Sequence, residues 1–288
     1  MSEREETLKR SERERWNKVA PAWATWWHVL ERGAQPLSDR MVELAAIEAG
    51  QRVLDIASGL GEPAATAARR VGPGGRVVAT DQSSGMVAAG RERALTLGLP
   101  QLEFREMDAD APDLPDASFD AVLCRWGLMF LPDLDRALLG LRRLLVPGGR
   151  MCAAVWSTAD EVPMIGMPAR IARSLIDVPP PAPDAPAPPA PFALADVHAL
   201  EAAFTRAGFV RARHETMKVT MTFESTEQFT AFVSEMSSSM AALLEDQPAA
   251  KRDLVWLGIR EAAAAFADGT GTVRMPNTTF CVVAEQPS

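Results

Sequence analysis

The sequence contains no tyrosine, only three cysteines and only three histidines among its 288 residues. The absence of tyrosine excludes every mechanism that uses a tyrosine acid, base or nucleophile. Cys124, Cys152 and Cys281 lie far apart in apolar stretches, which is typical of buried free thiols rather than of metal ligands or a disulfide framework. With so few histidines, we expect no multi-histidine metal centre and no metal in the chemistry.

A surplus of positive charge is also missing. Thirty Lys and Arg residues stand against 38 Asp and Glu residues, which gives a net charge of -8 and argues against nucleic acid or an anionic membrane as a partner. The first fifteen residues are too charged for a signal peptide, and no run of about 18 apolar residues could span a membrane. We therefore expect a soluble cytoplasmic protein, either a monomer or a homodimer.

Short apolar segments alternate with helical stretches in the middle of the chain. The predicted strands cover residues 52–57, 76–80, 102–107, 119–124 and 149–156, and the predicted helices between them cover residues 62–71, 84–98 and 133–145. Alternation of this kind predicts a parallel sheet with helices on both faces. A composition that is 47% hydrophobic is sufficient for one large α/β domain with an appended cap.

The segment before the first predicted strand is helical in character. Residues 1–31 form a charged and then tryptophan-rich helix, in which Pro21 stands where a second helical segment could begin. Residues 37–48 form a further amphipathic helix that ends at Gly50. We expect these helices to form a lid.

A proline-rich segment divides the second half of the chain. Residues 179–191 contain eight prolines, which predicts an extended spacer; a docking motif for a proline-reading domain is the alternative. After it, the pattern predicts a helix, a strand, two helices and a last strand, at residues 194–207, 209–223, about 226–267 and 272–284. We expect the last two strands to add to an edge of the first sheet.

The most informative segment is VLDIASGLGEP, residues 53–63. An apolar strand runs into a small-residue turn, in which Gly59 and Gly61 allow a ligand to approach the backbone. Dinucleotide enzymes use the same pattern, so the turn alone leaves an oxidoreductase open. Asp55, however, directly precedes the turn, where its negative charge disfavours a diphosphate and favours a cationic ligand.

Two more acids follow successive predicted strands. Asp81 ends the second strand, at the distance from the glycine turn where a carboxylate can accept both hydroxyls of a ribose. Asp108 follows the third strand and could accept a hydrogen bond from an adenine amino group. Because the carboxyl ends of parallel strands meet at one edge of a sheet, these acids should converge on one crevice.

In these motifs the chain resembles the class I S-adenosylmethionine-dependent methyltransferases of the ubiquinone and menaquinone biosynthesis type. The resemblance covers about residues 48–156 and includes VVATDQSSGM, MDADAPDLPDASFDAVLCRWGLMFLPD and LLVPGGRM in the expected order. It implies a Rossmann-like, seven-stranded mixed sheet whose last strand is antiparallel, with S-adenosylmethionine as the cofactor and a small molecule as the methyl acceptor. The acceptor atom, carbon, oxygen, nitrogen or sulfur, stays open.

The resemblance also implies the positions of the cofactor. Asp55 and Gly59 would border its methionine end, Asp81 its ribose, Asp108 and Ala109 its adenine, and Arg125 would lie beneath it. The cofactor-binding residues that it implies are Asp55, Ala57, Ser58, Gly59, Gly61, Asp81, Gln82, Met86, Asp108, Ala109 and Arg125. This sequence departs from the family motif at Ala57, where a glycine is usual.

The acceptor site is predicted from aromatic residues. Trp16, Trp23 and Trp27 share one helical face, which favours either core packing or a wall across the mouth of the crevice. His28, in the same segment, is the candidate general base, with a structural histidine as the alternative. The predicted acceptor-binding residues are Trp23, Trp27, Trp126, Met129 and Phe130. They indicate an apolar acceptor, aromatic or prenylated.

These observations predict five parts of the chain, namely an N-terminal lid at residues 1–48, a cofactor-binding core at 49–158, a helical and proline-rich insertion with an edge strand at 159–224, a helical cap at 225–271 and a final core strand at 272–288. The predicted function is methyl transfer to a small molecule by in-line displacement. The alternatives are a non-catalytic protein that binds the cofactor and, disfavoured by Asp55, a nicotinamide oxidoreductase.

Overall fold

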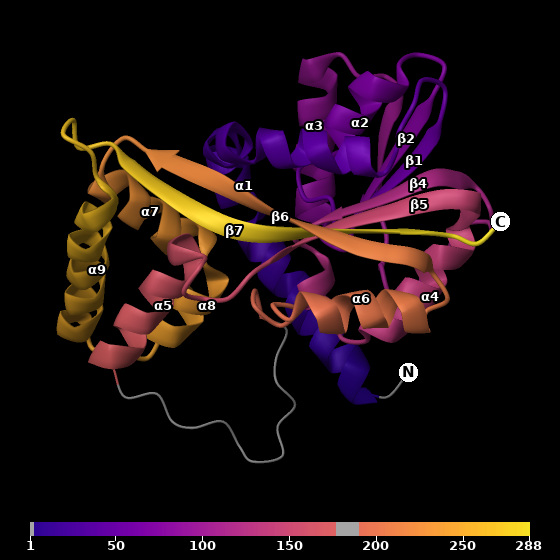
Figure 1. Ribbon diagram of the computed structural model, residues 1–288. Coiled ribbons are helices and arrows are strands. Elements are labelled where there is room, and N and C mark those ends of the chain that lie inside the picture. The colour runs from indigo at the N-terminus through magenta and orange to yellow at the C-terminus, as the bar shows by residue number, and fades with distance from the viewer. Residues whose placement is uncertain (1–2, 177–189) are drawn as a thin grey trace.

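The computed structural model describes residues 3–176 and 190–288. Most of the predicted proline-rich spacer, residues 179–189, lies outside this range. A seven-stranded sheet forms the centre of the molecule, with strand order β3-β2-β1-β4-β5-β7-β6 (Figure 1). The strands are Arg52–Ile56 (β1), Arg76–Asp81 (β2), Leu102–Glu106 (β3), Phe119–Arg125 (β4), Leu145–Trp156 (β5), Val210–Phe223 (β6) and Val273–Glu285 (β7).

Strands β1 to β5 are parallel, and β7 pairs antiparallel with both β5 and β6. The fold class and the edge position of the last two strands are therefore confirmed. The interior strands are buried over most of their length: β1 is fully buried from Val53 to Ile56, with Asp55 as its one charged residue, and β4 is fully buried and apolar from Ala121 to Cys124. This is the pattern expected of strands covered on both faces. Cys124, Cys152 and Cys281 are buried free thiols, as the sequence predicts.

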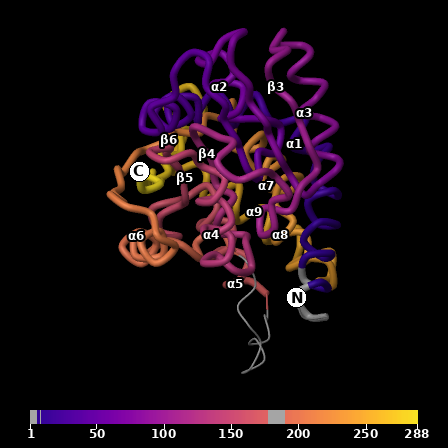
Figure 2. The backbone as a smooth tube through the Cα atoms, turned by 90° about the vertical axis from the view of Figure 1, so that its right-hand side faces the viewer, coloured from indigo at the N-terminus to yellow at the C-terminus, as the bar shows by residue number. Residues whose placement is uncertain are grey.

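The chain adds β2 and β3 on one side of β1 and then β4 and β5 on the other side. Because the connections between parallel strands are right-handed, this reversal of direction places the connecting helices on opposite faces of the sheet. The helices are Glu3–Leu44 (α1), Ala64–Val71 (α2), Ser84–Leu97 (α3), Leu134–Leu144 (α4), Pro163–Leu175 (α5), Val197–Arg206 (α6), Thr226–Met236 (α7), Ser238–Leu244 (α8) and Ala249–Ala263 (α9). Helices α4 and α6 lie side by side on one face (Figure 1, Figure 2). Within the described residues, no helix has the length and apolar character of a membrane span.

The N-terminal helices predicted as separate segments are one helix of 42 residues, with Pro21 and Pro36 inside it. Each proline lacks one backbone donor and clashes with the preceding turn, which bends a helix without ending it when packing holds both sides. Figure 1 shows α1 changing direction along its length. Leu37 and Met41 are fully buried beyond the second proline, so the sheet itself holds that part of the helix in place.

The long strands β6 and β7 extend past the rest of the sheet, and their paired ends carry a cap of helices α5, α7, α8 and α9 (Figure 1). The structure has three helices and a short 3-10 turn where two helices were predicted in residues 226–267. Ser237 ends α7 and precedes α8, and Pro248 precedes α9, so the residues predicted as two helices form three. Asn277 of β7 anchors α5, because its buried side chain accepts a hydrogen bond from the backbone N–H of Met164 at 3.1 Å.

Candidate functional site

A cavity opens at the carboxyl ends of the parallel strands, and α1 passes across it. The sheet side and its loops contribute Ala57, Ser58, Gly59, Leu60, Glu62, Asp81, Gln82, Met86, Arg93, Met107, Asp108 and Ala109. The segment after β4 contributes Arg125, Trp126, Gly127, Phe130, Leu131 and Pro132, and α1 contributes Lys9, Glu12, Trp16, Trp23, Trp27, Leu30 and Glu31. The cavity thus has a polar floor, formed by the sheet side and its loops, and a largely aromatic wall, formed by α1 and the segment after β4.

The loop after β1 turns sharply to present its backbone to the cavity. Ala57 and Gly59 both have left-handed backbone angles, with φ of 48° and 52°. The Ser58 N–H donates to the carbonyl of Thr80 on the neighbouring strand at 2.9 Å. The Ser58 hydroxyl lines the cavity and is buried without a hydrogen-bond partner in the described structure, so this loop holds a polar atom ready for a ligand.

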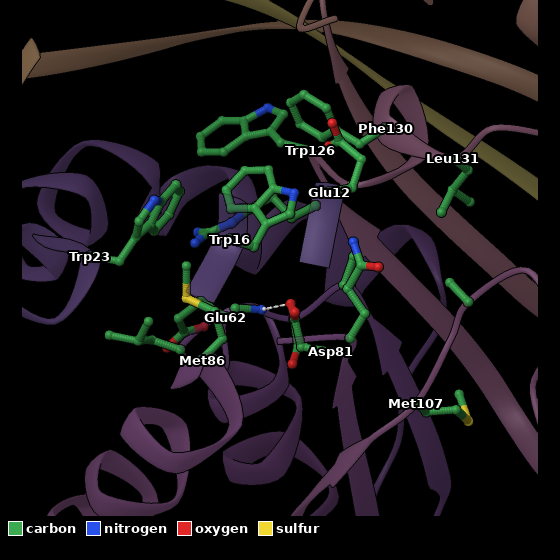
Figure 3. A pocket seen from close by; sticks show the side chains of 18 of the residues that line it. Glu12, Trp16, Trp23, Glu62, Asp81, Met86, Met107, Trp126, Phe130 and Leu131 are labelled. Atoms are coloured by element: carbon green, nitrogen blue, oxygen red, sulfur yellow. Dashed lines mark hydrogen bonds between the residues drawn. The ribbon is translucent and has the colours of Figure 1, made fainter. Parts of the chain in front are cut away.

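Asp81 lies at the end of β2 and faces the cavity (Figure 3). Its Oδ1 accepts a hydrogen bond from the Ser83 N–H at 2.9 Å, and its Oδ2 accepts one from the Gly59 N–H at 3.0 Å. Burial raises the pKa of the Asp81 carboxyl, an effect that these backbone donors oppose. Each oxygen keeps acceptor capacity for a ligand hydroxyl, and the bond to Gly59 fixes the glycine loop against β2.

Asp55 does not line the cavity but lies directly beneath the loop, fully buried. Its Oδ2 accepts a hydrogen bond from the Ala64 N–H at the start of α2 at 2.9 Å, whereas its Oδ1 has no partner in the described structure. Burial raises the pKa of Asp55 well above its usual range, and the positive charge of Arg125 opposes that rise. A buried carboxylate with one unpaired oxygen favours a cation nearby.

Arg125, at the end of β4, joins α1 to the sheet. Its guanidinium donates to Ser38 Oγ and to Glu31 Oε1, both at 2.9 Å. The other oxygen of Glu31 is buried without a partner in the described structure and belongs to the cavity lining. Trp126 follows with a left-handed φ of 60°; its ring stacks on Trp156 with centroids 4.0 Å apart. Strained residues of this kind cluster at functional sites.

An aromatic wall faces Asp81 across the cavity. Figure 3 shows Trp16, Trp126 and Phe130 grouped together, with Glu12 among them and with Asp81 and Met86 opposite. Trp16 makes edge contacts with Phe130 at 5.3 Å and with Trp23 at 6.2 Å between ring centroids. The predicted tryptophan stripe of α1 therefore faces the cavity.

Two charged side chains of α1 enter the site. Lys9 Nζ lies 2.7 Å from Asp108 Oδ2 and 2.9 Å from Asp110 Oδ2, so α1 is tied to the loop after β3. Glu12 is 9% exposed and pairs with Arg15. Burial raises the pKa of the Glu12 carboxyl, and the charge of Arg15 opposes this rise.

Most residues predicted from the sequence meet at this cavity. Those that line it are Ala57, Ser58, Gly59, Asp81, Gln82, Met86, Asp108, Ala109, Arg125, Trp23, Trp27, Trp126 and Phe130. Those that do not line it are Asp55, Gly61, Met129 and His28.

The four outside the lining have other surroundings. A Cβ on Gly61 would lie 2.4 Å from the Phe104 ring, so this glycine permits close packing of the loop on β3. Met129 is buried in the core. His28 is exposed and contacts the ring edge of Trp27. The structure thus gives no support for a base at His28.

Three charged side chains of α1 that line the cavity were not predicted from the sequence, namely Lys9, Glu12 and Glu31. They stand in a highly charged helix where an ordinary solvated face is the default expectation. Glu12 and Trp16 are four positions apart, and that spacing places them on one face. This spacing is the sequence feature that indicates that Glu12 faces the cavity with Trp16.

Comparisons with known proteins agree with this geometry. A family model described as a methyltransferase domain matches residues 53–149. The chain is 38% identical over 143 residues to the ubiquinone/menaquinone biosynthesis C-methyltransferase UbiE of Pseudomonas putida, covering 49% of this chain and 56% of that relative. It is 40% identical over 136 residues to UbiE of Ectopseudomonas oleovorans, covering 46% of this chain and 80% of that relative. The chain thus spans about half the length of the first relative.

Solved structures share the fold. The YcgJ protein of Bacillus subtilis superposes with a TM-score of 0.54 at 16% identity, covering 87% of this chain and 98% of that chain. Phosphoethanolamine N-methyltransferase 2 of Haemonchus contortus, in complex with S-adenosyl-L-methionine, superposes with a TM-score of 0.51 at 19% identity, covering 92% of this chain and 53% of that chain. The matched domain and the UbiE relatives, together with the shared fold, show that this chain belongs to the class I S-adenosylmethionine-dependent methyltransferases.

Proposed function

We propose that this protein transfers the methyl group of S-adenosylmethionine to a small apolar acceptor that carries an aromatic or other ring. One observation supports it above the others: a single cavity joins the polar floor around Asp81 to an aromatic wall from α1 and the end of β4. The UbiE relatives, which are named as C-methyltransferases of ubiquinone and menaquinone biosynthesis, support a ring-bearing acceptor.

The floor of the cavity fits the cofactor. Asp81 can accept the ribose hydroxyls, the unpartnered Ser58 hydroxyl and the Gly59 backbone can contact the methionine part, and the loop of Asp108 and Ala109 can hold the adenine. Asp55, beneath the loop with one unpaired oxygen, favours the positive charge of the sulfonium and ammonium groups. When bound, the cofactor supplies a methyl group on a cationic sulfur, an electrophile for in-line displacement.

The remaining task of the protein is to place the acceptor and exclude water. Placement of two reactants can lower a barrier by up to roughly 7 to 11 kcal/mol. Trp16, Trp23 and Trp27 of α1, with Trp126 and Phe130, offer flat apolar surfaces for a ring. We assign α1 as the lid of the site, residues 49–158 as the cofactor-binding core and the helices on β6 and β7 as the cap, each a proposal that rests on these contacts.

Methylation at a ring carbon or a hydroxyl requires that the acceptor lose a proton, and Glu12 is the candidate base. Its carboxyl lies among Trp16, Trp126 and Phe130 (Figure 3). A carboxylate with a raised pKa is a stronger base, closer to what transfer near neutral pH requires.

We predict that Glu12→Gln lowers kcat by about 100-fold or more with little change in affinity for S-adenosylhomocysteine. Because the ionised form acts as base, activity of the unmodified protein should fall as the pH drops through the pKa of Glu12, which burial raises from the ordinary glutamate value, and the variant should lose this dependence. The measurement is the pH profile of kcat. A full loss of activity in His28→Ala, with Glu12→Gln active, would instead support the sequence-based prediction for His28.

The methyl-transfer proposal is tested with isotope-labelled S-adenosylmethionine incubated with an extract of the source organism. Label should enter the organic-soluble fraction, and it should not do so with Asp81→Asn, which removes the charged acceptor for the ribose. Label found in precipitated material alone would contradict a small-molecule acceptor. Cofactor binding by calorimetry without transfer in any fraction would favour a non-catalytic binding protein.

A further inference from the structure

Two of the three histidines in the sequence, on the consecutive elements α6 and β6, lie against the same carboxylate. His198 and Glu201 stand one turn apart on α6, and His214 projects from β6, the strand on which that helix packs. His214 Nδ1 is 2.9 Å from Glu201 Oε1, and His198 Nδ1 is 3.4 Å from Glu201 Oε2. The two imidazole rings are 5.5 Å apart between centroids.

This spacing matches the coordination sphere of a small transition metal ion. Zinc binds histidine nitrogen and carboxylate oxygen at about 2.0 to 2.2 Å with tetrahedral geometry, which places neighbouring ligand atoms roughly 3.3 to 3.6 Å apart. One ligand atom from each of His198, Glu201 and His214 can be chosen so that all lie within 4.8 Å of one another. Small side-chain adjustments would therefore seat an ion, with water completing the fourth position.

The surroundings suit a site that loads from solvent. The His198 side chain is 81% exposed, whereas those of Glu201 and His214 are 23% and 26% exposed. The His214 ring packs edge-on against Phe280 of β7, with centroids 5.9 Å apart, which limits its movement. Glu201 and His214 are thus held in place by the fold, and the exposed His198, in the first turn of α6, would complete the site from the solvent side.

We propose that His198, Glu201 and His214 form a binding site for a divalent transition metal ion, preferably zinc. The bound ion would link α6 to the edge strand β6. The two imidazole ligands favour zinc, nickel and copper over magnesium or calcium. None of these three residues lines the methyl-transfer cavity, so the ion takes no part in that chemistry. With only three histidines in the chain, the sequence predicts no multi-histidine centre, and it is the packing of α6 on β6 that brings two of them together.

Binding of an ion to the folded state alone stabilises that state. A metal ion across α6 and β6 should therefore raise the melting temperature of the protein and slow amide exchange in α6.

The test uses the full chain without a histidine tag, freed of metal by a chelator. Calorimetry with zinc chloride and absorption spectroscopy with cobalt chloride should show one ion per chain. Affinity should fall more than about tenfold in His198→Ala, His214→Ala and Glu201→Gln. His28→Ala is the matched control, because it removes the one other histidine of the sequence outside the cluster; the three cysteines are buried.

His198→Ala alters an exposed side chain, so folding of this variant should equal that of the unmodified chain and a loss of binding is attributable to the ligand. Absence of saturable binding in the unmodified chain would overturn the proposal and leave a hydrogen-bonded trio. Equal zinc affinity in His198→Ala and His214→Ala relative to the unmodified chain would overturn it as well. Because the readouts are metal affinity and melting temperature, the result does not depend on the methyl-transfer proposal.

Discussion

At the scale of the residue, Ala57 and Gly127 form a complementary pair. Ala57 has a left-handed φ of 48°, a conformation that costs an L-residue about 1 to 2 kcal/mol. Its methyl group fits because residue 127 has none: a Cβ on Gly127 would lie 2.6 Å from the Ala57 Cβ and 2.8 Å from Cys124 Sγ. The departure of this sequence from the glycine of the family motif is thus accommodated on the facing segment.

We predict that Ala57→Gly raises the free energy of unfolding slightly, by up to about 1 kcal/mol, because relief of backbone strain exceeds the added chain entropy. Gly127→Ala should lower it by about 1 to 3 kcal/mol through overpacking. In the double variant the loss should be smaller than in Gly127→Ala, since one of the two close contacts is removed. Urea unfolding of the four proteins measures this coupling, and strictly additive effects would contradict the pairing.

Asp55 is a second residue whose burial has a measurable consequence. Its pKa is raised in the folded state above the unfolded value of about 3.9, so the folded state binds more protons between these two pKa values. Stability associated with this group is fully present below the unfolded pKa and is lost as the pH rises through the folded pKa. The charged form of Asp55 therefore destabilises the protein at neutral pH.

We predict that Asp55→Asn raises the free energy of unfolding by about 1 to 3 kcal/mol at neutral pH and that the difference disappears near pH 4. The same change should weaken binding of S-adenosylmethionine, because the positive end of the cofactor loses a negative partner. Thermal unfolding across pH and calorimetry measure the two effects. A variant that is less stable at neutral pH and binds the cofactor equally well would contradict both.

At the scale of the element, α1 shows where sequence patterns suffice and where they do not. The strands β1 to β4 could be predicted to within two residues because three of them are short, mainly apolar runs that end at a polar turn and β3 alternates between apolar and charged residues. Pro21 predicted a break in α1 that did not occur, because a local rule cannot include packing from distant strands. A Cβ on Gly33 would lie 2.6 Å from the sulfur of Met221 on β6, so β6 holds α1 between its prolines.

The same distinction applies to the site. Asp81, Asp108 and the glycine loop were predictable because topology alone brings the ends of parallel strands together. Lys9, Glu12 and Glu31 were not, because they reach the cavity only through the path of α1 over the sheet. The charged side chains of α1 are thus the part of the cavity that a sequence motif describes least.

We predict that Lys9 holds the first turns of α1 against the loop that follows β3. Its Nζ bridges Asp108 and Asp110, and hydrogen bonds to charged groups contribute about 1.5 to 3 kcal/mol. Lys9→Met should therefore increase proteolysis and amide exchange in the first turns of α1 and speed cofactor release, with little change in melting temperature. Lys18→Met, at an exposed position on the same helix, is the control. If amide exchange and proteolysis in the first turns of α1 were equal in the Lys9→Met and Lys18→Met variants, the proposed role of Lys9 would be contradicted.

At the scale of the whole molecule, the two parts of the sheet support different features: the parallel strands support the cavity, and the antiparallel pair supports the cap. The parallel part ends at the cofactor floor, while the extended antiparallel pair β6 and β7 carries the cap (Figure 1). Helix α1 spans both: Lys9 and Asn17 contact the floor side, and Trp26 reaches α7. The position of the lid is therefore set by the core and by the cap together.

The contact between lid and cap is specific enough to test. Trp26 Nε1 donates to Glu235 Oε2 at 2.7 Å, and the Trp26 ring packs edge-on against Phe232 with centroids 5.6 Å apart. Because neither Trp26 nor Glu235 lines the cavity, Trp26→Phe and Glu235→Ala should leave the affinity for S-adenosylhomocysteine unchanged. They should raise the KM for the acceptor several-fold by loosening the aromatic wall.

Both changes remove the same hydrogen bond, so the double variant should be no worse than Trp26→Phe alone, with a coupling free energy of about 1 kcal/mol. Glu224→Ala, at an exposed position just before α7, is the matched control and should alter neither constant. Independent effects of the two substitutions on acceptor KM, or equal losses of cofactor and acceptor binding, would mean that the cap does not position the lid. The coupling predicted here requires instead that acceptor recognition depend on a contact outside the cavity, one that the extended strands β6 and β7 make possible by carrying α7 to the side of α1.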